Sequence, residues 1–404
     1  RYTLTPPGLS ADLAPFFRKK YPKLRCIGMD LISVSSYSNR EEGRKAHHAF
    51  LNPYKGEPIL LIEDMKLDTT DHFNKIIVLG SNSFTGGHFI DHILKNSHCE
   101  IIGISRSPEY HPFFLPFLYR KERPDRYTFC QLDVNKDLEE ICSRCDDLKP
   151  DVIVNFAAQG EVRNSWKWPL QWYKTNCISV VRLTEHLKTK NYLKKYVAVS
   201  TPEVYGTTSE NIQEGHEYYP STPYATSKLA GELHLFALYK HYNFPVVFTR
   251  SANLYGIHQQ LYRIIPRTII YLKLGKTLDL HGRGEVLRSF IHARDVADLT
   301  YRAILNGENG GIYHFASDDG LHNIANVVQL ICELMGYEFR RFVNLVDENF
   351  GQDSQYSLDA TKAKKQLGWK QRVAFADGIK ETINWIEENW EFIRKQPLEY
   401  IHKD

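Results

Sequence analysis

The chain has 404 residues, of which 42% are hydrophobic and 25% are charged, a composition typical of a globular protein. Its 51 basic and 48 acidic side chains leave a net charge of +3, which gives no general case for a nucleic-acid or membrane partner. No apolar run reaches the roughly 18 to 20 residues that a membrane helix needs, and no signal peptide opens the sequence, so we expect a cytoplasmic protein. Because the first residue is Arg1 rather than Met, we expect the natural start to lie upstream.

The seven cysteines are scattered and odd in number. Cys142 and Cys145 form a C-x-x-C pair, but the surrounding segment DLEEICSRCDDLK has the pattern of a helix, and no second pair stands at zinc spacing. We therefore expect free thiols in a reducing compartment and no metal site.

Strands and helices alternate along the chain from about Asp71 onward. The predicted strands are Lys75–Gly80, Glu100–Ile104, Tyr127–Val134, Asp151–Ala157, Tyr196–Thr201 and Pro245–Arg250. The predicted helices are Gly87–Lys95, Trp172–Lys188 and Ser227–Tyr242. Apolar strands that alternate with helices predict an α/β fold with a parallel, doubly wound sheet that is covered on both faces.

The alternation loosens after Gly256. The segments with helical or strand patterns are Ile264–Leu274, Val296–Leu305, Gly311–Ala316, Ile324–Met335 and Ala376–Ile393. We interpret this half as a smaller α/β lobe that is woven into the sheet domain.

A glycine-containing turn follows the first strand and leads into a helix. A parallel sheet carries its dinucleotide phosphate site at this place. Gly80 allows the tight turn, Gly86 lets the helix pack close to the strand, and the helix N-terminus offers N–H groups to a pyrophosphate. We assign Asn82, Ser83 and Phe84 to the same site. Ser83 replaces the usual middle glycine and places a side chain where backbone should approach phosphate, so a plain strand–turn–helix connection is the alternative.

The residues at the ends of the second and third strands help to predict which cofactor binds. The second strand runs into Ser105 and Arg106, with no carboxylate to hold a ribose 2′-hydroxyl, and Arg106 could pair with a 2′-phosphate instead. We therefore favour NADP over NAD, with a solvated Arg106 as the alternative. At the end of the third strand stand Asp133 and Val134; Asp133 could accept from the adenine amino group or cap the next helix.

A tyrosine and a lysine four residues apart mark the part of the site where the reaction would occur, which we call the chemical end. Tyr224 and Lys228, in YATSK, face the same way if the segment is helical. An ammonium at Lys228 lowers the pKa of the phenol, so that a tyrosinate can take a hydroxyl proton while hydride leaves carbon. The spacing alone is common, but here it follows a nucleotide strand, NFAAQ and STPEVYG in that order.

With these motifs in place, the chain resembles the extended short-chain dehydrogenase/reductase family, and within it the NAD-dependent nucleotide-sugar 4,6-dehydratases and epimerases. The resemblance runs from about Lys75 to Trp390 and implies a Rossmann sheet. It also implies that NFAAQGEVRNSW lines the cofactor through Ala157, Ala158 and Gln159.

Further motifs concern the sugar nucleotide. RSANLYG, RSFIHARDVAD and LDATKAKKQLGW resemble segments of the family. They imply a diphosphate-sugar site that includes Asn253, Arg263 and Arg288, and a guanidinium fork at Arg288 suits a diphosphate. The resemblance divides the chain into an extension at 1–70, a mainly NAD(P)-binding domain at 71–256 and a mainly substrate-binding lobe at 257–404.

The segment STPEVYG decides between reactions. The resemblance implies that Thr201 bonds the sugar 4-hydroxyl. Pro202 departs from the aspartate of the dTDP-glucose enzymes and cannot donate a proton. Glu203 remains as the base for the C5 proton, which is acidic once C4 is a ketone. A structural carboxylate that caps the next turn is the alternative for Glu203.

We therefore expect a nucleotide-sugar 4,6-dehydratase with tightly bound NAD(P), in which Thr201, Glu203, Tyr224 and Lys228 act on a nucleotide-diphosphate sugar. A 4-epimerase or decarboxylase of the same family stays open, and so does a non-catalytic NAD(P) sensor that keeps the fold. The resemblance also implies a homodimer.

The first seventy residues resemble another family, the cyclase/arylformamidase hydrolases, through RCIGMDLISVSS and PILLIEDMKL. The resemblance places metal ligands near His48 or His47 and near Glu63, but the family's earlier histidine motif is missing. Two ligands hardly hold a catalytic metal, so we interpret the segment as a remnant without a metal site.

Overall fold

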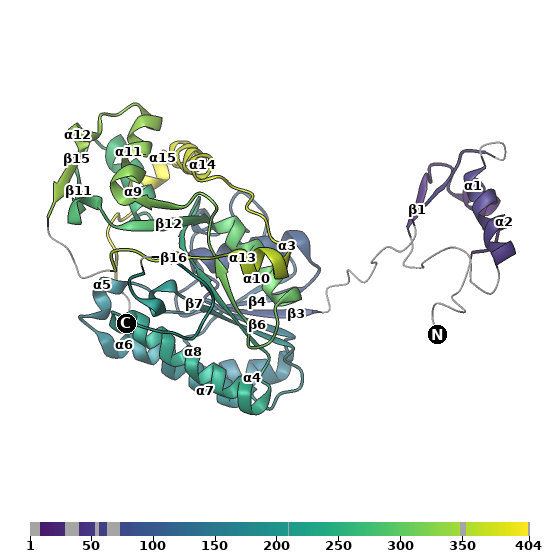
Figure 1. The fold of residues 1–404 in the computed structure, drawn as a ribbon, viewed down its shortest axis with the longest axis horizontal. Helices are drawn as coiled ribbons and strands as arrows, with labels where there is room; N and C mark the ends of the chain where they lie inside the picture. Colours follow the sequence, from purple (N-terminus) through teal and green to yellow (C-terminus); the bar gives the residue numbers. More distant parts are fainter. Residues whose placement is uncertain are drawn as a thin grey trace. The chain divides into compact units, whose positions relative to one another are not determined.

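The computed structural model describes residues 9–28, 40–52, 56–62, 73–208, 210–347 and 353–402. The chain forms two compact units, Arg1–His72 and Phe73–Asp404 (Figure 1). The predicted sheet domain and the predicted smaller lobe both lie in the second unit.

The first unit is small. Its elements are α1 (Leu13–Lys20), β1 (Cys26–Gly28), α2 (Arg40–Leu51) and β2 (Leu60–Ile62). β1 and β2 pair in parallel, and Ala14, Phe50 and Ile59 form a buried core beneath them. His47 and His48 lie on α2, whereas Glu63 lies outside the described residues. The remnant interpretation of this unit stays a prediction.

A seven-stranded parallel sheet forms the centre of the second unit, with the strand order β13-β9-β7-β6-β3-β4-β5 (Figure 1). The strands are β3 (Lys75–Leu79), β4 (Glu100–Ser105), β5 (Tyr127–Gln131), β6 (Val152–Asn155), β7 (Lys195–Ser200), β9 (Val246–Ser251) and β13 (Ile312–Phe315). The chain winds outward from β3 in one direction and from β6 in the other, so a crevice opens at the carboxyl ends of these two strands. This is the predicted doubly wound sheet.

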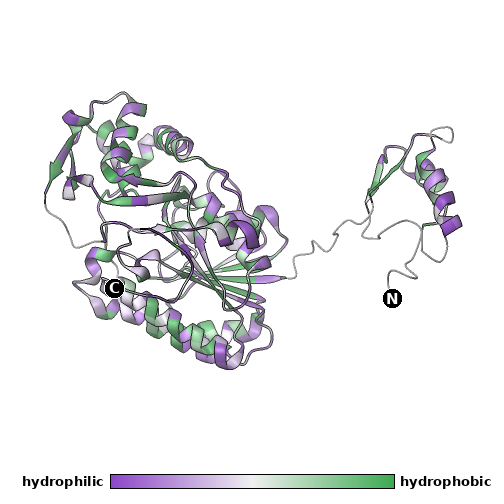
Figure 2. Ribbon diagram, viewed as in Figure 1, coloured by the Kyte–Doolittle hydropathy of each residue, from purple (hydrophilic) through white to green (hydrophobic). Residues whose placement is uncertain are grey.

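The strands of the sheet are rich in apolar residues (green in Figure 2), and their side chains form two buried cores. Successive side chains of a strand point to opposite faces, so Ile76 and Val78 join one core while Ile77 and Leu79 join the other. The first core is covered by α3 (Phe84–Asn96), α10 (Ala293–Asn306) and α13 (Thr361–Leu367). The second is covered by α4 (Leu138–Leu148), α7 (Ser179–Leu187) and α8 (Pro223–Tyr242).

The smaller lobe has a core of its own, in which α9, α11 and α14 pack together. Its helices are α9 (Ile264–Lys273), η6 (Gly282–Gly284), α11 (Ile324–Met335), α12 (Phe339–Phe342), α14 (Phe375–Glu388) and α15 (Trp390–Ile393). Its strands are β10 (Asn253–Tyr255), β11 (Leu278–His281), β12 (Leu287–His292), β14 (Leu321–Asn323) and β15 (Val343–Val346). The connections contain η3 (Pro112–Phe114), α5 (Val162–Ser165), α6 (Pro169–Tyr173), η4 (Lys174–Ile178), η5 (Pro202–Tyr205), β8 (Asn211–Ile212) and β16 (Ser357–Leu358).

The predicted strands of the sheet are confirmed, and so are the helical stretches around Trp172–Lys188, but the predicted helix Ala376–Ile393 is divided. The stretch Trp172–Lys188 contains the end of α6, the π-helix η4 and then α7. The stretch Ala376–Ile393 is broken at Asn389, whose side chain accepts from the Tyr119 hydroxyl at 2.9 Å and donates to the Trp385 carbonyl at 2.7 Å. The helix therefore ends at a contact with Tyr119, although the apolar periodicity of the sequence continues beyond it.

Three expected absences can be checked only within the described part of the chain. There, no helix has the length and apolarity for a membrane span. No group of three or more histidine, cysteine or acidic side chains is placed to hold a metal ion among the same residues. The seven cysteines are free thiols, and burial raises the pKa of Cys145 to about 12.

Candidate functional site

A cavity of about 230 Å³ lies at the carboxyl ends of β3, β4, β5 and β6, in the crevice where a doubly wound sheet binds its ligand. Ten of the residues predicted for the cofactor line it. They are Gly80, Asn82, Ser83, Ser105, Arg106, Asp133, Val134, Ala157, Ala158 and Gln159. Phe84, Gly86 and Lys228, which were also predicted, lie outside the lining.

The two glycines of the turn are required by close backbone contacts. Gly80 has φ +81°, and a Cβ there would stand 2.7 Å from the amide nitrogen of Ala157. A Cβ on Gly86 would collide with the carbonyl oxygen of Gly80. The turn thus packs backbone against backbone at the helix start, and this is the cradle that a pyrophosphate needs.

Ser83 is the N-cap of α3. Its φ of −71° needs no glycine, and its hydroxyl accepts from the N–H of Gly86 at 3.0 Å. The serine that replaces the usual middle glycine therefore has a local role. Its hydroxyl satisfies one free N–H of the first helical turn. The plain strand–turn–helix alternative does not account for the cavity beside it.

Asn82 organises the loop that follows β4. Its N–H donates to the Ser105 hydroxyl at 3.0 Å, and its side-chain amide donates to the carbonyls of Ser107 and Pro108. These bonds place Arg106 on the cavity wall, half-exposed. The contact of Arg106 with a 2′-phosphate stays a prediction.

Asp133 closes a turn after β5 by accepting from the N–H of Asn135 at 2.8 Å. In its alternative role, Asp133 caps this turn and not the helix α4, whose N-cap position is Asp137. The Asn135 amide in turn donates to the Thr175 hydroxyl at 3.0 Å, and both residues line the cavity.

The segment after β6 is held by a residue that the sequence analysis missed. Asn176, in the π-helix η4, accepts from the N–H of Gln159 at 2.9 Å and donates to its carbonyl at 3.0 Å. The same amide donates to the Ser227 hydroxyl on α8 at 3.0 Å. Asn176 thus ties the cavity wall to the helix of Tyr224. The sequence signal that could have revealed this role was a pair of polar residues, Thr175 and Asn176, inside a helical stretch.

The segment STPEVYG forms the short 3₁₀ helix η5 after β7. Thr201 is its N-cap, and its hydroxyl accepts from the N–H of Glu203 at 3.3 Å. Pro202 occupies the first helical position, where a missing N–H leaves no bond unmade. The turn therefore tolerates proline at the position that differs from the dTDP-glucose enzymes, and it presents Glu203 next.

Tyr224 and Lys228 lie one turn apart at the start of α8, as predicted. Burial and the charge of Glu203 raise the pKa of the Tyr224 phenol, while a hydrogen bond with Thr201 and the charge of Arg263 lower it. Lys228 donates to the carbonyl of Val199 at 2.6 Å. The role of Lys228 in lowering the pKa of the phenol stays a prediction, and in the structure its ammonium is bonded to β7.

Glu203 has the properties of an acid–base group. Among the residues that the structure describes, its carboxylate has no hydrogen-bond partner, so the capping alternative has no support. Burial raises its pKa to about 7; the charges of Asp353 and Glu161 act in the same direction, and those of Arg288 and Arg263 oppose them. Such a group exchanges protons at neutral pH.

Each of the predicted sugar-nucleotide residues is engaged with another residue of the chain, and Arg288 and Arg263 lie near the Glu203 carboxylate. Arg288, buried on β12, donates to the carbonyls of Leu287 and Asp353, each at 2.8 Å. Asn253 accepts from the Tyr356 hydroxyl at 2.6 Å. Arg263 lies 3.6 Å from the Glu161 carboxylate, which the sequence analysis did not single out.

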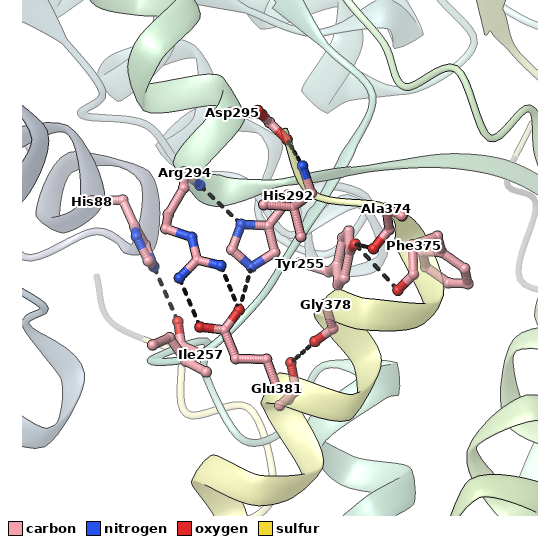
Figure 3. Close-up of polar contacts among 12 residues, drawn as sticks. His88, Tyr255, Ile257, His292, Arg294, Asp295, Ala374, Phe375, Gly378 and Glu381 are labelled. Carbon is pink, nitrogen blue, oxygen red and sulfur yellow. Dashed lines mark hydrogen bonds and ion pairs between the residues drawn. The ribbon is translucent and has the colours of Figure 1, made fainter. Parts of the chain in front are cut away.

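A group of polar contacts joins the sheet domain to the smaller lobe (Figure 3). His88 on α3 donates to the carbonyl of Ile257 at 3.0 Å and so holds the loop after β10, whose Gln260 lines the cavity. Arg294 on α10 pairs with Glu381 on α14 through two bonds of 2.7 and 2.6 Å (Figure 3). These contacts fasten helices of the sheet domain to the loop after β10 and to a helix of the smaller lobe.

Comparisons with known proteins agree with this arrangement. The family model described as GDP-mannose 4,6 dehydratase matches residues 77–382. The dTDP-D-glucose 4,6-dehydratase of Bos taurus is 30% identical over 331 residues, which are 80% of this chain and 92% of that protein. A trifunctional UDP-glucose 4,6-dehydratase/UDP-4-keto-6-deoxy-D-glucose 3,5-epimerase/UDP-4-keto-L-rhamnose-reductase of Arabidopsis thaliana is 29% identical over 330 residues; this chain spans about half of its length, 49%.

Two solved structures share the fold. DesIV, the dTDP-glucose 4,6-dehydratase from Streptomyces venezuelae with NAD and TYD bound, has a TM-score of 0.72 and 27% identity; the match covers 79% of this chain and 98% of that one. The UDP-glucuronic acid 4-epimerase from Bacillus cereus, in complex with UDP-glucuronic acid and NAD, has a TM-score of 0.70 and 25% identity over 78% of this chain and 99% of that one.

Proposed function

The chain belongs to the family described as GDP-mannose 4,6 dehydratase, and from this premise we propose that it is a nucleotide-sugar 4,6-dehydratase that works with bound NAD(P). The product would be a nucleotide-linked 4-keto-6-deoxy sugar. The observation that carries the proposal is Glu203, a carboxylate without a hydrogen-bond partner in the described chain and with its pKa raised to about 7, beside Thr201 and Tyr224.

The cofactor fits the cavity at the switch point of the sheet. The Gly80 turn and the start of α3 would hold the pyrophosphate, the loop with Arg106 and the turn of Asp133 would hold the adenosine end, and Gln159 lies toward α8. Bound there in its oxidised form, NAD(P) would supply the hydride chemistry that takes a hydride from C4 and gives it to C6.

Tyr224 takes the proton from the sugar 4-hydroxyl in the first half of the reaction. Burial and the charge of Glu203 raise the pKa of its phenol, and the bond with Thr201 and the positive charge of Arg263 oppose this rise and favour the tyrosinate. Burial lowers the pKa of Lys228 to about 8, so this lysine remains cationic at pH 7, and its bond to Val199 fixes the first turn of α8 against β7.

Glu203 acts in the second half. As a carboxylate it removes the proton from C5, which the C4 ketone has made acidic, and as the acid it protonates the C6 hydroxyl that leaves as water. Because the C5 proton leaves in the water, the proton that Tyr224 took from the 4-hydroxyl balances the one that is delivered to C5 as hydride reaches C6. The net change is the loss of one water, and Pro202 takes no part because it has no proton to give.

The test is a panel of dTDP-, UDP-, GDP- and CDP-hexoses incubated with the purified full chain and analysed by mass spectrometry. Loss of one water from one sugar would support the proposal and name the substrate. An unchanged mass with an altered sugar configuration would replace it with 4-epimerisation, the activity named for the Bacillus cereus structure. Release of carbon dioxide from a uronic acid would replace it with decarboxylation.

The choice of cofactor is part of the proposal. NAD is bound in the neighbouring structures, whereas Arg106 on the cavity wall supports the predicted preference for NADP. Mass spectrometry of the cofactor released from the purified chain decides between them. Measurement of molar mass by light scattering likewise tests the expected homodimer.

A further inference from the structure

The turn that carries Thr201 and Glu203 is attached at both flanks to one buried ion pair. Before the turn, the Ser200 hydroxyl donates to the Glu232 carboxylate at 2.5 Å. After it, the Tyr205 hydroxyl is bonded to the Arg250 guanidinium. Glu232 on α8 and Arg250 on β9 form an ion pair with each other, and their exposed fractions are 3% and 0%.

The other contacts of Arg250 are neutral and aromatic. Its guanidinium lies 4.7 Å from the ring centre of Tyr205 and 5.1 Å from that of Tyr218, and it donates to the Tyr218 hydroxyl at 2.9 Å. His314 on β13 bonds the Tyr205 hydroxyl at 2.8 Å. Tyr205 is thus held from two strands at once, and Glu232 supplies the charge that balances the buried arginine.

Stability alone is a weak reason for such a pair. Two charges taken out of water lose about as much hydration free energy as they regain by attraction, and an apolar replacement is often as stable. The positions of the pair explain it better, since Ser200 and Tyr205 bracket the two reacting side chains. Glu232 also lies one turn after Lys228 on α8, so one carboxylate relates the turn to the helix of Tyr224.

We propose that Glu232 and Arg250 are positioning residues that set the distance of Thr201 and Glu203 from Tyr224. This inference rests on the proposed dehydratase function. Proton transfers depend steeply on geometry, because a displacement of about 1 Å lowers the rate by roughly 100-fold. Loss of the pair should therefore lower kcat and leave the binding of the sugar nucleotide almost unchanged.

The experiment compares Ser200→Ala, Tyr205→Phe and Glu232→Gln in the full chain with two matched controls. Glu185→Gln changes an exposed carboxylate on the neighbouring α7, and Tyr219→Phe changes a tyrosine that is 74% exposed. We expect kcat to fall roughly 100-fold in Glu232→Gln and roughly tenfold in Tyr205→Phe and Ser200→Ala, with KM within about threefold of the parent.

Hydrogen–deuterium exchange of the peptide that covers residues 196–206 gives a readout that does not require turnover. We expect faster exchange in the three variants than in the controls. If Glu232→Gln does not fold, Ser200→Ala and Tyr205→Phe decide. Unchanged kcat and unchanged exchange in both would overturn the proposal, and so would a loss that appears only in KM. If the parent turns over no sugar, the proposed function fails, and the exchange data alone then support or overturn the positioning role.

Discussion

The two ends of the site are built by different means. At the cofactor end, the contacts are made by backbone groups and short polar side chains, such as the close approach of Gly80 to Ala157 and the bond from Ser83 to Gly86. At the chemical end, long charged side chains from distant segments neutralise one another, as Arg263 does with Glu161 and Arg250 with Glu232.

This difference shows how each end is expected to respond to change. A backbone cradle fails when a side chain is added to it, because nothing nearby can move aside. A set of paired charges fails when one partner is removed, because the other is left buried without compensation. The predictions that follow therefore add a side chain at the cofactor end and remove a charged group at the chemical end.

The largest effect is expected at Glu203. Glu203→Gln should lower dehydration by roughly 100-fold or more, because an amide neither removes the C5 proton nor protonates the leaving hydroxyl. Oxidation of C4 should persist, so reduced cofactor should accumulate and be visible by absorbance in single-turnover experiments. Glu210→Gln, an exposed change in the following connection, is the control. Full dehydration by Glu203→Gln would remove Glu203 from the mechanism.

The pH dependence of the parent enzyme sharpens the same test. Burial raises the pKa of Glu203 to about 7, so the carboxylate form that removes the C5 proton predominates only above that pH. The rate of elimination should therefore fall as the pH drops through about 7. This limb of the profile should be missing from the residual activity of Glu203→Gln, and its persistence there would assign it to another group.

Gly86→Ala should come next in size. The new Cβ would collide with the carbonyl of Gly80, so the turn must open, and we expect cofactor affinity to fall by at least about tenfold, a loss of about 1.4 kcal/mol. Gly160→Ala is a matched control, because no atom lies within 4 Å of a Cβ at that position. Calorimetric titration with NAD and NADP measures both. Equal affinity in the two variants would mean that the cofactor does not use this turn.

The contacts between the sheet domain and the smaller lobe should be sensitive to acid. Burial lowers the pKa of His88 to about 3, of His258 to about 4 and of His292 to about 2. Each histidine therefore binds a proton in the unfolded chain before it does in the folded one, and stability is lost as the pH falls below about 6.5. At pH 5 the loss is about 2 kcal/mol for each histidine.

His88→Gln tests this sensitivity. Glutamine can donate to the Ile257 carbonyl but does not titrate. Between pH 7.5 and pH 5, the free energy of unfolding of the variant should therefore fall by about 2 kcal/mol less than that of the parent. Denaturant unfolding at the two pH values measures the difference. His241→Gln changes an exposed histidine and should behave as the parent does. An identical pH effect in His88→Gln and the parent would contradict the assignment.

The smallest effect is expected at Arg106. If its guanidinium meets a 2′-phosphate, Arg106→Gln should weaken NADP by about 1 kcal/mol, roughly fivefold, and change NAD little, since the group is half-exposed. Competition between the two cofactors measures the ratio. A parent enzyme that prefers NAD, with no change of the ratio in Arg106→Gln, would place Arg106 outside the recognition of the cofactor.

The amino-acid sequence alone determined the doubly wound sheet, the turn after β3 and the places of Tyr224 and Lys228, because each depends on neighbours within one strand, turn or helix. Ten of the cofactor predictions meet in one cavity since the ends of parallel strands share one edge. Only the tertiary structure decided that Asn176 ties Gln159 to Ser227, that Arg288 binds the carbonyl of Asp353, and that Lys228 turns to Val199. These contacts join segments between 17 and 65 residues apart, and no local pattern records which partner satisfies a buried polar group.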